Sequence, residues 1–238
     1  MLSRLAWLAL EVKYLEEARS FYEGTLSMTV RSAAADELTL AAGGTDLVLR
    51  RPAGVPRGGL HTHYAFSIPA DEYGEWWDRL ERAYDGDLEE VQFGSAKSLY
   101  LYDPDGNCVE LGQQDVEGPG IDGVFEVVLE VENLERAEAM WREVGFETVD
   151  RGERRTRVRM NGPMALELWE PQLGIADARG GVHVDLGFET SDPLAVADAL
   201  RDRALSVDDA DEDRVVVRDP DGHHLTFVPS PSAADDSA

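Results

Sequence analysis

Two side chains on neighbouring predicted strands could hold a divalent metal. His63 opens the segment HYAFSI, and Glu110 lies in NCVEL after the turn DPDG. A β-strand points alternate side chains to one face, so His61 shares the face of His63, and Cys108 shares that of Glu110. An imidazole and a carboxylate together suit Mn, Fe, Ni or Zn. Two ligands do not complete a site. A hydrogen-bonded histidine in a cavity is the alternative, and Cys108 is either a small filler or a soft further ligand.

The elements that must position these side chains belong to an internal repeat. Three pairs of segments recur at shifts of 116 to 120 residues: YLEEARSFYEG from Tyr14 with NLERAEAMWREVG from Asn133, DPDG from Asp103 with DPDG from Asp219, and HYAFSIPAD from His63 with HVDLGFETSD from His183. Because the chain has 238 residues, this period divides it into two tandem copies. Gly118, Pro119 and Gly120 have the composition of a linker between them.

Each copy is double again. An apolar run followed by a helical pattern begins at Trp7, and a similar pair begins at His63, 56 residues later. Glu126 and His183, 57 residues apart, open the corresponding runs of the second copy. Each of the four units predicts a strand, a helix of about ten to fourteen residues and three short strands. One helix for every four strands is an α+β pattern, and DPDG predicts a tight turn between antiparallel strands.

These units, the helix string ending in SFYEG, and the pair HYAF and DPDGNCVEL resemble the vicinal oxygen chelate superfamily. That superfamily includes glyoxalase I, extradiol dioxygenases, bleomycin-binding proteins and fosfomycin-resistance enzymes. Residues 1–115 are most similar to the fosfomycin-resistance thiol transferases, through MLSRLAWLALEV, LHTHYAFSIPADEY and SLYLYDPDGNCVEL. The resemblance implies two tandem glyoxalase-like domains, each with two βαβββ units that form a cupped mixed sheet around a metal. We therefore expect domains at 1–118 and 119–230, and a disordered tail at 231–238.

In the first cup, the resemblance places His63 and Glu110 at two ligand positions and Trp7 at the third. Indole has no lone pair available for a metal, so Trp7 would instead fill part of the cup and contact a substrate. Ser98 and Tyr100 match positions that contact the anionic substrate in the fosfomycin enzymes. The segment GQQDVEGPG after Glu110 has no arginine where those enzymes bind an anion, which argues against fosfomycin modification.

In the second cup, the resemblance places Glu126 at the first-strand ligand position and His183 at the matching position of the last unit. Glu167, in MALELWEP, falls near the ligand position of the third unit, where a one-residue gap leaves two registers open. Thr226 stands where the glutamate of DPDGNCVEL would be, and His224 on the same strand face could replace that carboxylate. Alternatively, Glu126 and Glu167 reach solvent or pair with the arginines of RGERRTRVR.

Charge and composition narrow the function classes. The chain carries 48 acidic and 22 basic side chains, and its formal charge of −26 would repel a nucleic-acid backbone. Only Lys13 and Lys97 are lysines, and an acidic chain with so few lysines predicts adaptation to molar salt. No apolar stretch is long enough for a membrane span, and the single cysteine excludes an internal disulfide framework. We expect a cytoplasmic protein without membrane or nucleic-acid partners.

Two functions from different classes fit these features. The first is a divalent-metal-dependent enzyme on a small oxygen-bearing molecule: a dioxygenase, a lyase or a fosfomycin-resistance-like transferase. Ring cleavage would need ferrous iron with a second imidazole, which His61 could supply only if its strand is bulged. The second is a metal-free small-molecule-binding protein of the bleomycin-resistance type, and a scaffold with filled cups is a weaker third. Because one chain completes two cups, a monomer is feasible and a homodimer is possible.

Overall fold

The computed structural model describes residues 2–52, 59–153, 156–171, 184–208 and 213–231. In these residues the chain forms four consecutive βαβββ units, as the repeats predict, and the fold is α+β. The predicted tail at 231–238 lies, apart from Pro231, outside the described residues, and so does His183. No helix among the described residues is both long and apolar enough to cross a bilayer.

The four units have the same order of elements. The first contains β1 (Leu2–Glu11), α1 (Leu15–Arg19), β2 (Thr29–Ala33), β3 (Glu37–Ala42) and β4 (Thr45–Arg50). The second contains β5 (Leu60–Pro69), α2 (Tyr73–Ala83), β6 (Glu89–Phe93), β7 (Ala96–Tyr102) and β8 (Cys108–Gln114). The third contains β9 (Gly123–Glu130), α3 (Leu134–Glu143), β10 (Glu147–Arg151), β11 (Arg157–Asn161) and β12 (Ala165–Trp169). The fourth contains β13 (Val184–Thr190), α4 (Pro193–Leu200), β14 (Ser206–Asp208), β15 (Val215–Arg218) and β16 (His224–Pro229).

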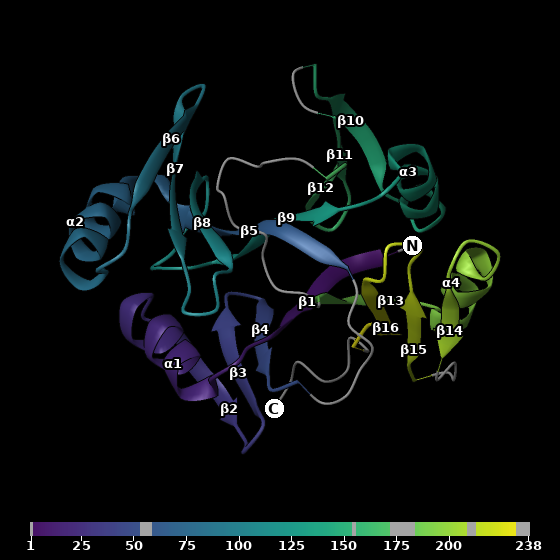
Figure 1. The fold of residues 1–238 in the computed structure, drawn as a ribbon, viewed down its shortest axis with the longest axis horizontal. Helices are drawn as coiled ribbons and strands as arrows, with labels where there is room; N and C mark the ends of the chain where they lie inside the picture. The colour runs from purple at the N-terminus through teal and green to yellow at the C-terminus, as the bar shows by residue number, and fades with distance from the viewer. Residues whose placement is uncertain (1, 53–58, 154–155, 172–183, 209–212, 232–238) are drawn as a thin grey trace.

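The units pair across the two sequence copies rather than within them. Sheet A joins the first and fourth units in the order β14-β15-β16-β13-β1-β4-β3-β2, and sheet B joins the second and third in the order β10-β11-β12-β9-β5-β8-β7-β6. In Figure 1 the purple β1 lies beside the green β13, although they come from opposite ends of the chain. The expectation that each cup is built from one sequence copy is therefore wrong. The domain boundary at residue 118 stays a prediction, and sheet B crosses it.

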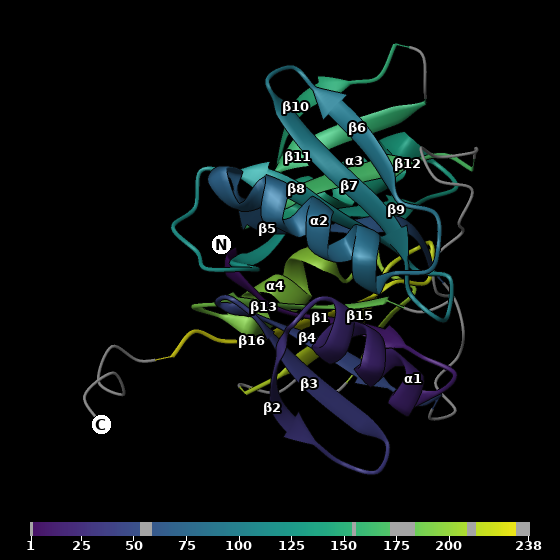
Figure 2. The same ribbon diagram turned by 90° about the vertical axis from the view of Figure 1, so that its left-hand side faces the viewer.

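A common hydrophobic core holds the two sheets together. Figure 2 shows sheet B above sheet A, and most of the buried apolar residues of both sheets and of the helices form one contiguous cluster. Alternation sets which side chains enter it: in β3 Leu38, Leu40 and Ala42 are buried, while the residues between them are half-exposed. On the central strand β5 nine consecutive residues are buried, because side chains on the second face are covered as well. That second face carries the candidate site.

The helix expected at LEEARSFYEGTL forms, but it changes from an α-helix to a π-helix partway along. Residues Leu15–Arg19 are α-helical, and Ser20–Thr25 continue as a wider π-helical turn closed by the bond from Leu26 N to Phe21 O at 3.0 Å. The wider turn lets the adjacent residues Phe21 and Tyr22 both point into the core. There the Tyr22 hydroxyl donates to Asp103 at 2.8 Å.

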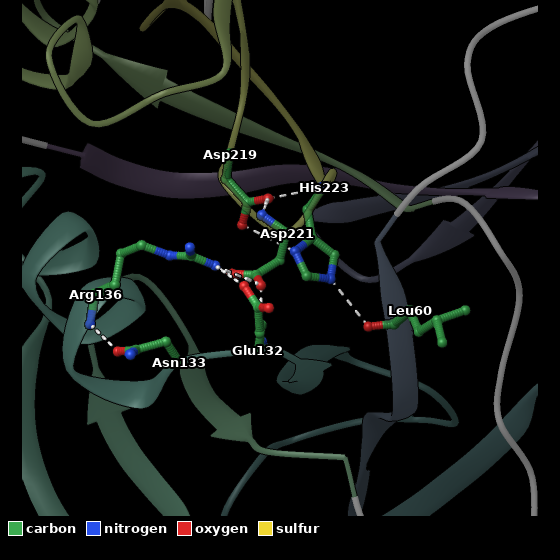
Figure 3. A network of polar contacts seen from close by, with 7 residues as sticks. All are labelled: Leu60, Glu132, Asn133, Arg136, Asp219, Asp221 and His223. Carbon is green, nitrogen blue, oxygen red and sulfur yellow. Dashed lines mark hydrogen bonds and ion pairs between the residues drawn. The ribbon is translucent and has the colours of Figure 1, made fainter.

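Both DPDG segments form the predicted turns, and both also connect the two sheets. Gly106 and Gly222 take φ values of 84° and 94°, which favour glycine. Asp105 Oδ1 of the turn in sheet B accepts from Lys13 N just before α1 at 2.8 Å. Asp221 Oδ1 of the turn in sheet A accepts from Glu132 N just before α3 at 2.7 Å (Figure 3). Each turn therefore fixes a helix that follows a central strand of the other sheet.

Candidate metal centre and its counterpart in the other sheet

The two residues singled out first from the sequence do meet inside sheet B. His63 on β5 and Glu110 on β8 are 3% and 4% exposed, and His63 Nε2 lies 3.3 Å from Glu110 Oε2. The strands run parallel, and Ala65 lies opposite Glu110. His63 is two residues before Ala65, so its imidazole projects from the same face of the sheet as the Glu110 carboxylate.

The third unit adds two more carboxylates to this same cup. Glu126 on β9 lies opposite Ala65, and Glu126 Oε1 is 3.5 Å from His63 Nε2. Glu167 on β12 lies opposite Val128, which is two residues after Glu126. In the same way, Glu110 on β8 lies opposite Ala65, which is two residues after His63. His63 and Glu126 are therefore equivalent positions, as are Glu110 and Glu167. The assignment of Glu126 and Glu167 to a second, separate cup is wrong, because the second and third units share one sheet.

Three of these side chains suit a cation. Donor atoms of His63, Glu110 and Glu126 all lie within 4.8 Å of one another, and all three residues are buried. One imidazole and two carboxylates are donors that Mn, Fe, Ni and Zn accept. The chemistry of the donor set therefore fits the divalent metal that the sequence suggested. Cys108 is not in this group.

The two walls of the cup differ at equivalent positions. On the second-unit side, Tyr100 lies opposite Glu110 and its hydroxyl donates to Glu110 Oε2 at 2.8 Å, with Ser98 two residues before it. On the third-unit side, Arg159 lies opposite Glu167 and Arg157 two residues before it. The neutral hydroxyl groups of Ser98 and Tyr100 thus line one wall of the cavity, and the guanidinium groups of Arg157 and Arg159 line the other. Ser98 and Tyr100 were expected in this cup from the sequence. The possible pairing of Glu126 and Glu167 with arginines is also realised.

A cavity of about 980 Å³ opens over this cluster. Its apolar lining comes from the β6–β7 hairpin and from the third unit, and includes Val91, Phe93, Phe125 and Trp169. The rings of Tyr100 and Trp169 meet the His63 imidazole edge to face, with centroids at 5.7 Å and 6.3 Å. The cup can therefore hold a small molecule whose polar end reaches the donor cluster and whose apolar part contacts the aromatic wall.

The electrostatics of the donor cluster follow from its two carboxylates and its imidazole. Burial lowers the pKa of His63, but hydrogen bonds and charge from Glu110 and Glu126 outweigh it and raise that pKa to about 9. Burial raises the pKa of Glu110, and His63 reverses this, so that the pKa lies below its ordinary value. Burial and then the Glu110 charge raise the pKa of Tyr100, which keeps its hydroxyl a donor. Without a metal, the imidazole is therefore a cation held between two carboxylates.

His61 and Cys108 do not join the cluster. The pairing of β5 with β9 shifts register between His61 and His63, so the bulge required for a second imidazole is present. The bulge places His61 beside Tyr64, with ring centroids at 5.9 Å, on the face opposite His63. Burial, and then the Glu110 charge, raise the pKa of Cys108 to about 12. The thiol therefore stays protonated in an apolar pocket with Val91 and Tyr102, as a filler would.

Trp7 lies in the other sheet and not in the cup of His63. It occupies on β1 the place that His63 occupies on β5, with Gly187 of β13 beside it. A Cβ atom on Gly187 would fall 2.0 Å from Trp7 Cε2, so the indole lies directly on the glycine backbone. The expectation that Trp7 contacts a substrate together with Ser98 and Tyr100 is wrong, because the first unit pairs with the fourth. In sheet A the half-buried indole covers Gly187 instead.

The residue equivalent to Glu126 in sheet A is Asp185, which the sequence reasoning missed. Ala9 of β1 lies opposite Asp185, as Ala65 of β5 lies opposite Glu126. Asp185 Oδ1 accepts from Thr226 Oγ1 at 2.9 Å, and Asp185 Oδ2 lies 3.3 Å from Arg50 Nη1. His183, which the resemblance placed at the equivalent position, lies outside the described residues.

The spacing of the DPDG turns leads to Asp185 only once the pairing of β13 with β16 is known. Glu110 and Thr226 each stand seven residues after the first aspartate of their DPDG segments. Gly187 lies opposite Thr226, so the first-strand position must be counted back from Gly187, which leads to Asp185. Thr226 does replace the glutamate, as predicted. Among the described residues, His224 is not part of a group of three potential ligands.

Comparisons with known proteins agree with this architecture. Residues 4–111 match the family described as the Glyoxalase/Bleomycin resistance protein/Dioxygenase superfamily. Glyoxalase I from Zea mays is similar over 95% of this chain and 92% of its own, with 18% sequence identity and a TM-score of 0.67. A candidate dioxygenase from Bacillus subtilis is similar over 97% of this chain and 86% of its own, with 17% identity and a TM-score of 0.70. These low identities show a shared fold. The sequence has no significant match among curated proteins.

Proposed function

We propose that sheet B holds a divalent metal and activates a small oxygen-bearing molecule there, and the match of residues 4–111 to the Glyoxalase/Bleomycin resistance protein/Dioxygenase superfamily supports this. The ligands would be His63, Glu110 and Glu126. One observation carries the proposal: donor atoms of these three buried residues converge within 4.8 Å at the base of a cavity. Buried carboxylates without a compensating cation are costly, and a metal would supply that charge.

The side chains around the donors have distinct tasks in this site. A bound divalent metal acts as a Lewis acid toward substrate oxygens. The Tyr100 hydroxyl fixes Glu110 through its 2.8 Å bond, and Arg159 fixes Glu126 by pairing with Oε2, which leaves Oε1 toward His63. Phe93, Phe125 and Trp169 exclude water from the apolar part of the ligand. The cup therefore orients the substrate as well as the donors.

The donor set favours a lyase, isomerase or transferase over ring-cleaving dioxygenase chemistry. Non-haem iron oxygenases use two imidazoles and one carboxylate. In the part of the chain that the structure describes, the cup offers only His63 as an imidazole, and His61 lies on the opposite face. Both units of this cup come from one chain, so a monomer suffices for the proposed activity.

Metal analysis tests the proposal directly. Protein purified without chelator and without an affinity tag should contain about one equivalent of Mn, Fe, Ni or Zn. Glu110→Gln and Glu126→Gln should each lower the affinity for Mn²⁺ by about a hundredfold, because each variant removes one of the two carboxylates among the three ligands. Asp185→Asn, at the position of Glu126 in sheet A, is the matched control and should retain the metal. Parent protein that binds none of these metals would contradict the proposal.

A metal-free ligand-binding protein is the second candidate, and one observation favours it. Arg159 already pairs with both Glu126 and Glu167, and a charged His63 lies between Glu110 and Glu126, so protein cations balance much of the negative charge. In that case an aromatic probe such as catechol should quench tryptophan fluorescence equally with Mn²⁺ or with EDTA present. The metal proposal expects quenching that depends on Mn²⁺.

A further inference from the structure

Glu167 stands at a ligand position but already has protein partners on both carboxylate oxygens. Oε1 lies 3.0 Å from Arg159 Nη1 and 3.3 Å from Arg157 Nη1. Oε2 accepts from Trp169 Nε1 at 2.7 Å. Two guanidinium groups and an indole N–H thus satisfy this carboxylate without any bound ion.

The equivalent carboxylate of the second unit has no cationic arginine beside it. At the place of Arg159 the second unit has Tyr100, whose neutral hydroxyl donates to Glu110. At the place of Trp169 it has Gly112, which has no donor side chain. No arginine pairs with the Glu110 carboxylate, whereas two arginines neutralise that of Glu167.

Arg159 also contacts Glu126, on the side away from His63. Its Nη1 pairs with Glu126 Oε2, whereas Glu126 Oε1 faces His63 Nε2 at 3.5 Å. One guanidinium therefore bridges Glu126 and Glu167. Burial lowers the pKa of Arg159 but the two carboxylates raise it further, so this bridge stays charged.

This inference rests on the proposed function. We propose that Arg159 is a positioning residue that withholds Glu167 from the metal, so that the site has three protein ligands and not four. On a six-coordinate ion three protein ligands leave three positions for water or substrate, whereas four leave two.

The first test removes the bridge. In Arg159→Met the carboxylate of Glu167 becomes available, and a positive charge near the metal is lost. We expect Mn²⁺ affinity, measured by competition with a chelator, to increase at least about tenfold. Proton relaxation of water by the bound Mn²⁺ should fall, because Glu167 displaces a water molecule. Arg159→Lys keeps the charge without the fork that spans two carboxylates and should give a smaller gain.

The second test asks whether Glu167 is the source of the gain. Glu167→Gln alone should change Mn²⁺ affinity by less than about threefold, because in the parent protein this residue does not bind the metal. In Arg159→Met/Glu167→Gln the fall in water relaxation should disappear and most of the affinity gain should be lost. Arg157→Met removes a guanidinium that contacts Glu167 but not Glu126, and it should preserve the parent's water relaxation.

The outcomes separate this inference from the proposed function. If the parent binds Mn²⁺ and Arg159→Met binds it no more tightly and with the same water relaxation, the role of Arg159 is refuted and the metal site stands. If only Arg159→Met binds Mn²⁺, Arg159 does withhold the carboxylates, but the parent is a metal-free protein. If the parent binds and the double variant keeps the full change, Glu167 is not the withheld ligand and the inference fails.

Discussion

The cups of sheets A and B have the same backbone pairing and opposite contents. Position by position, sheet B carries His63, Glu110, Glu126 and Glu167 where sheet A carries Trp7, Val48, Asp185 and Thr226. In sheet B the donors face a cavity of about 980 Å³. In sheet A the indole lies on Gly187, and Asp185 is satisfied by Thr226, Arg50 and Trp7, the last at 3.4 Å.

This contrast shows that strand pairing supplies the place for a site while side chains decide its use. One carboxylate remains at the Glu126 position in both cups, and in both an arginine pairs with it. The imidazole and the Glu110 carboxylate are what sheet A lacks. Sheet B therefore keeps the donors on which the proposed function rests, and sheet A does not.

The largest expected effect comes from giving sheet A the missing donors. Trp7→His/Val48→Glu places an imidazole and a carboxylate at the positions of His63 and Glu110, next to Asp185. We expect a second Mn²⁺ to bind, raising the stoichiometry toward about two per chain, because the donor set then matches that of sheet B. Calorimetric titration measures it, and Trp7→His alone, with two donors, is the control that should not add a site. If the double variant folds but still binds no additional Mn²⁺, the two cups share their strand pairing but not the geometry that a metal site needs.

A smaller effect is expected where the indole meets the glycine backbone. Gly187→Ala adds a Cβ atom 2.0 Å from Trp7 Cε2, so the ring must move, and the free energy of unfolding should fall by roughly 2 kcal/mol. Trp7→His should relieve the loss, so the double variant Trp7→His/Gly187→Ala should show a positive coupling in a urea-unfolding cycle. Gly123→Ala on β9, whose Cβ would meet only Ser67 at 3.5 Å, should cost little. Equal losses at the two glycines would mean that Trp7 does not rest on Gly187.

Sequence reasoning reached the units of this fold but not their pairing. The repeats near Tyr14 and Asn133 and the two DPDG turns report local structure, which each unit forms for itself. They hold no information on which unit completes which sheet, because the pairing of β1 with β13 joins segments that lie far apart in the sequence, from Leu2 with Thr190 to Leu10 with Val184. Trp7 and Glu126 were assigned to the wrong cups for this reason.

Register was the second limit. A two-residue slip leaves the alternation of a strand unchanged, so His183 and Asp185 fit the apolar pattern equally well. The bulge between His61 and His63 likewise arises from the β5–β9 pairing, and no residue type in the sequence marks it. His63, Glu110, Ser98 and Tyr100 were grouped correctly because all four lie within one unit.

The turns that connect the sheets offer the smallest test of the comparison. In sheet B the turn ends at Asn107, whose side-chain amide donates to Asp103 at 2.8 Å, and in sheet A it ends at His223, whose Nδ1 lies 2.9 Å from Asp219 Oδ2. His223 Nε2 also reaches the carbonyl of Leu60 at 2.9 Å, at the start of β5 (Figure 3). A doubly protonated imidazole can donate to both partners. Only the turn of sheet A therefore uses an imidazole in this link.

Burial lowers the pKa of His223, but the charge and hydrogen bond of Asp219 outweigh it and raise the pKa above 6.5. The stability from this raised pKa is complete below about pH 6.5 and is lost as the pH rises through the folded-state value. His223→Asn copies the turn of sheet B and should cost about 1 kcal/mol at pH 6 through the lost bond to Leu60. At pH 9 the cost should be smaller. Urea unfolding of the parent, His223→Asn and His224→Asn at both pH values measures the difference. A loss independent of pH would show that His223 is neutral in the folded protein, and the two turns would then differ in shape alone.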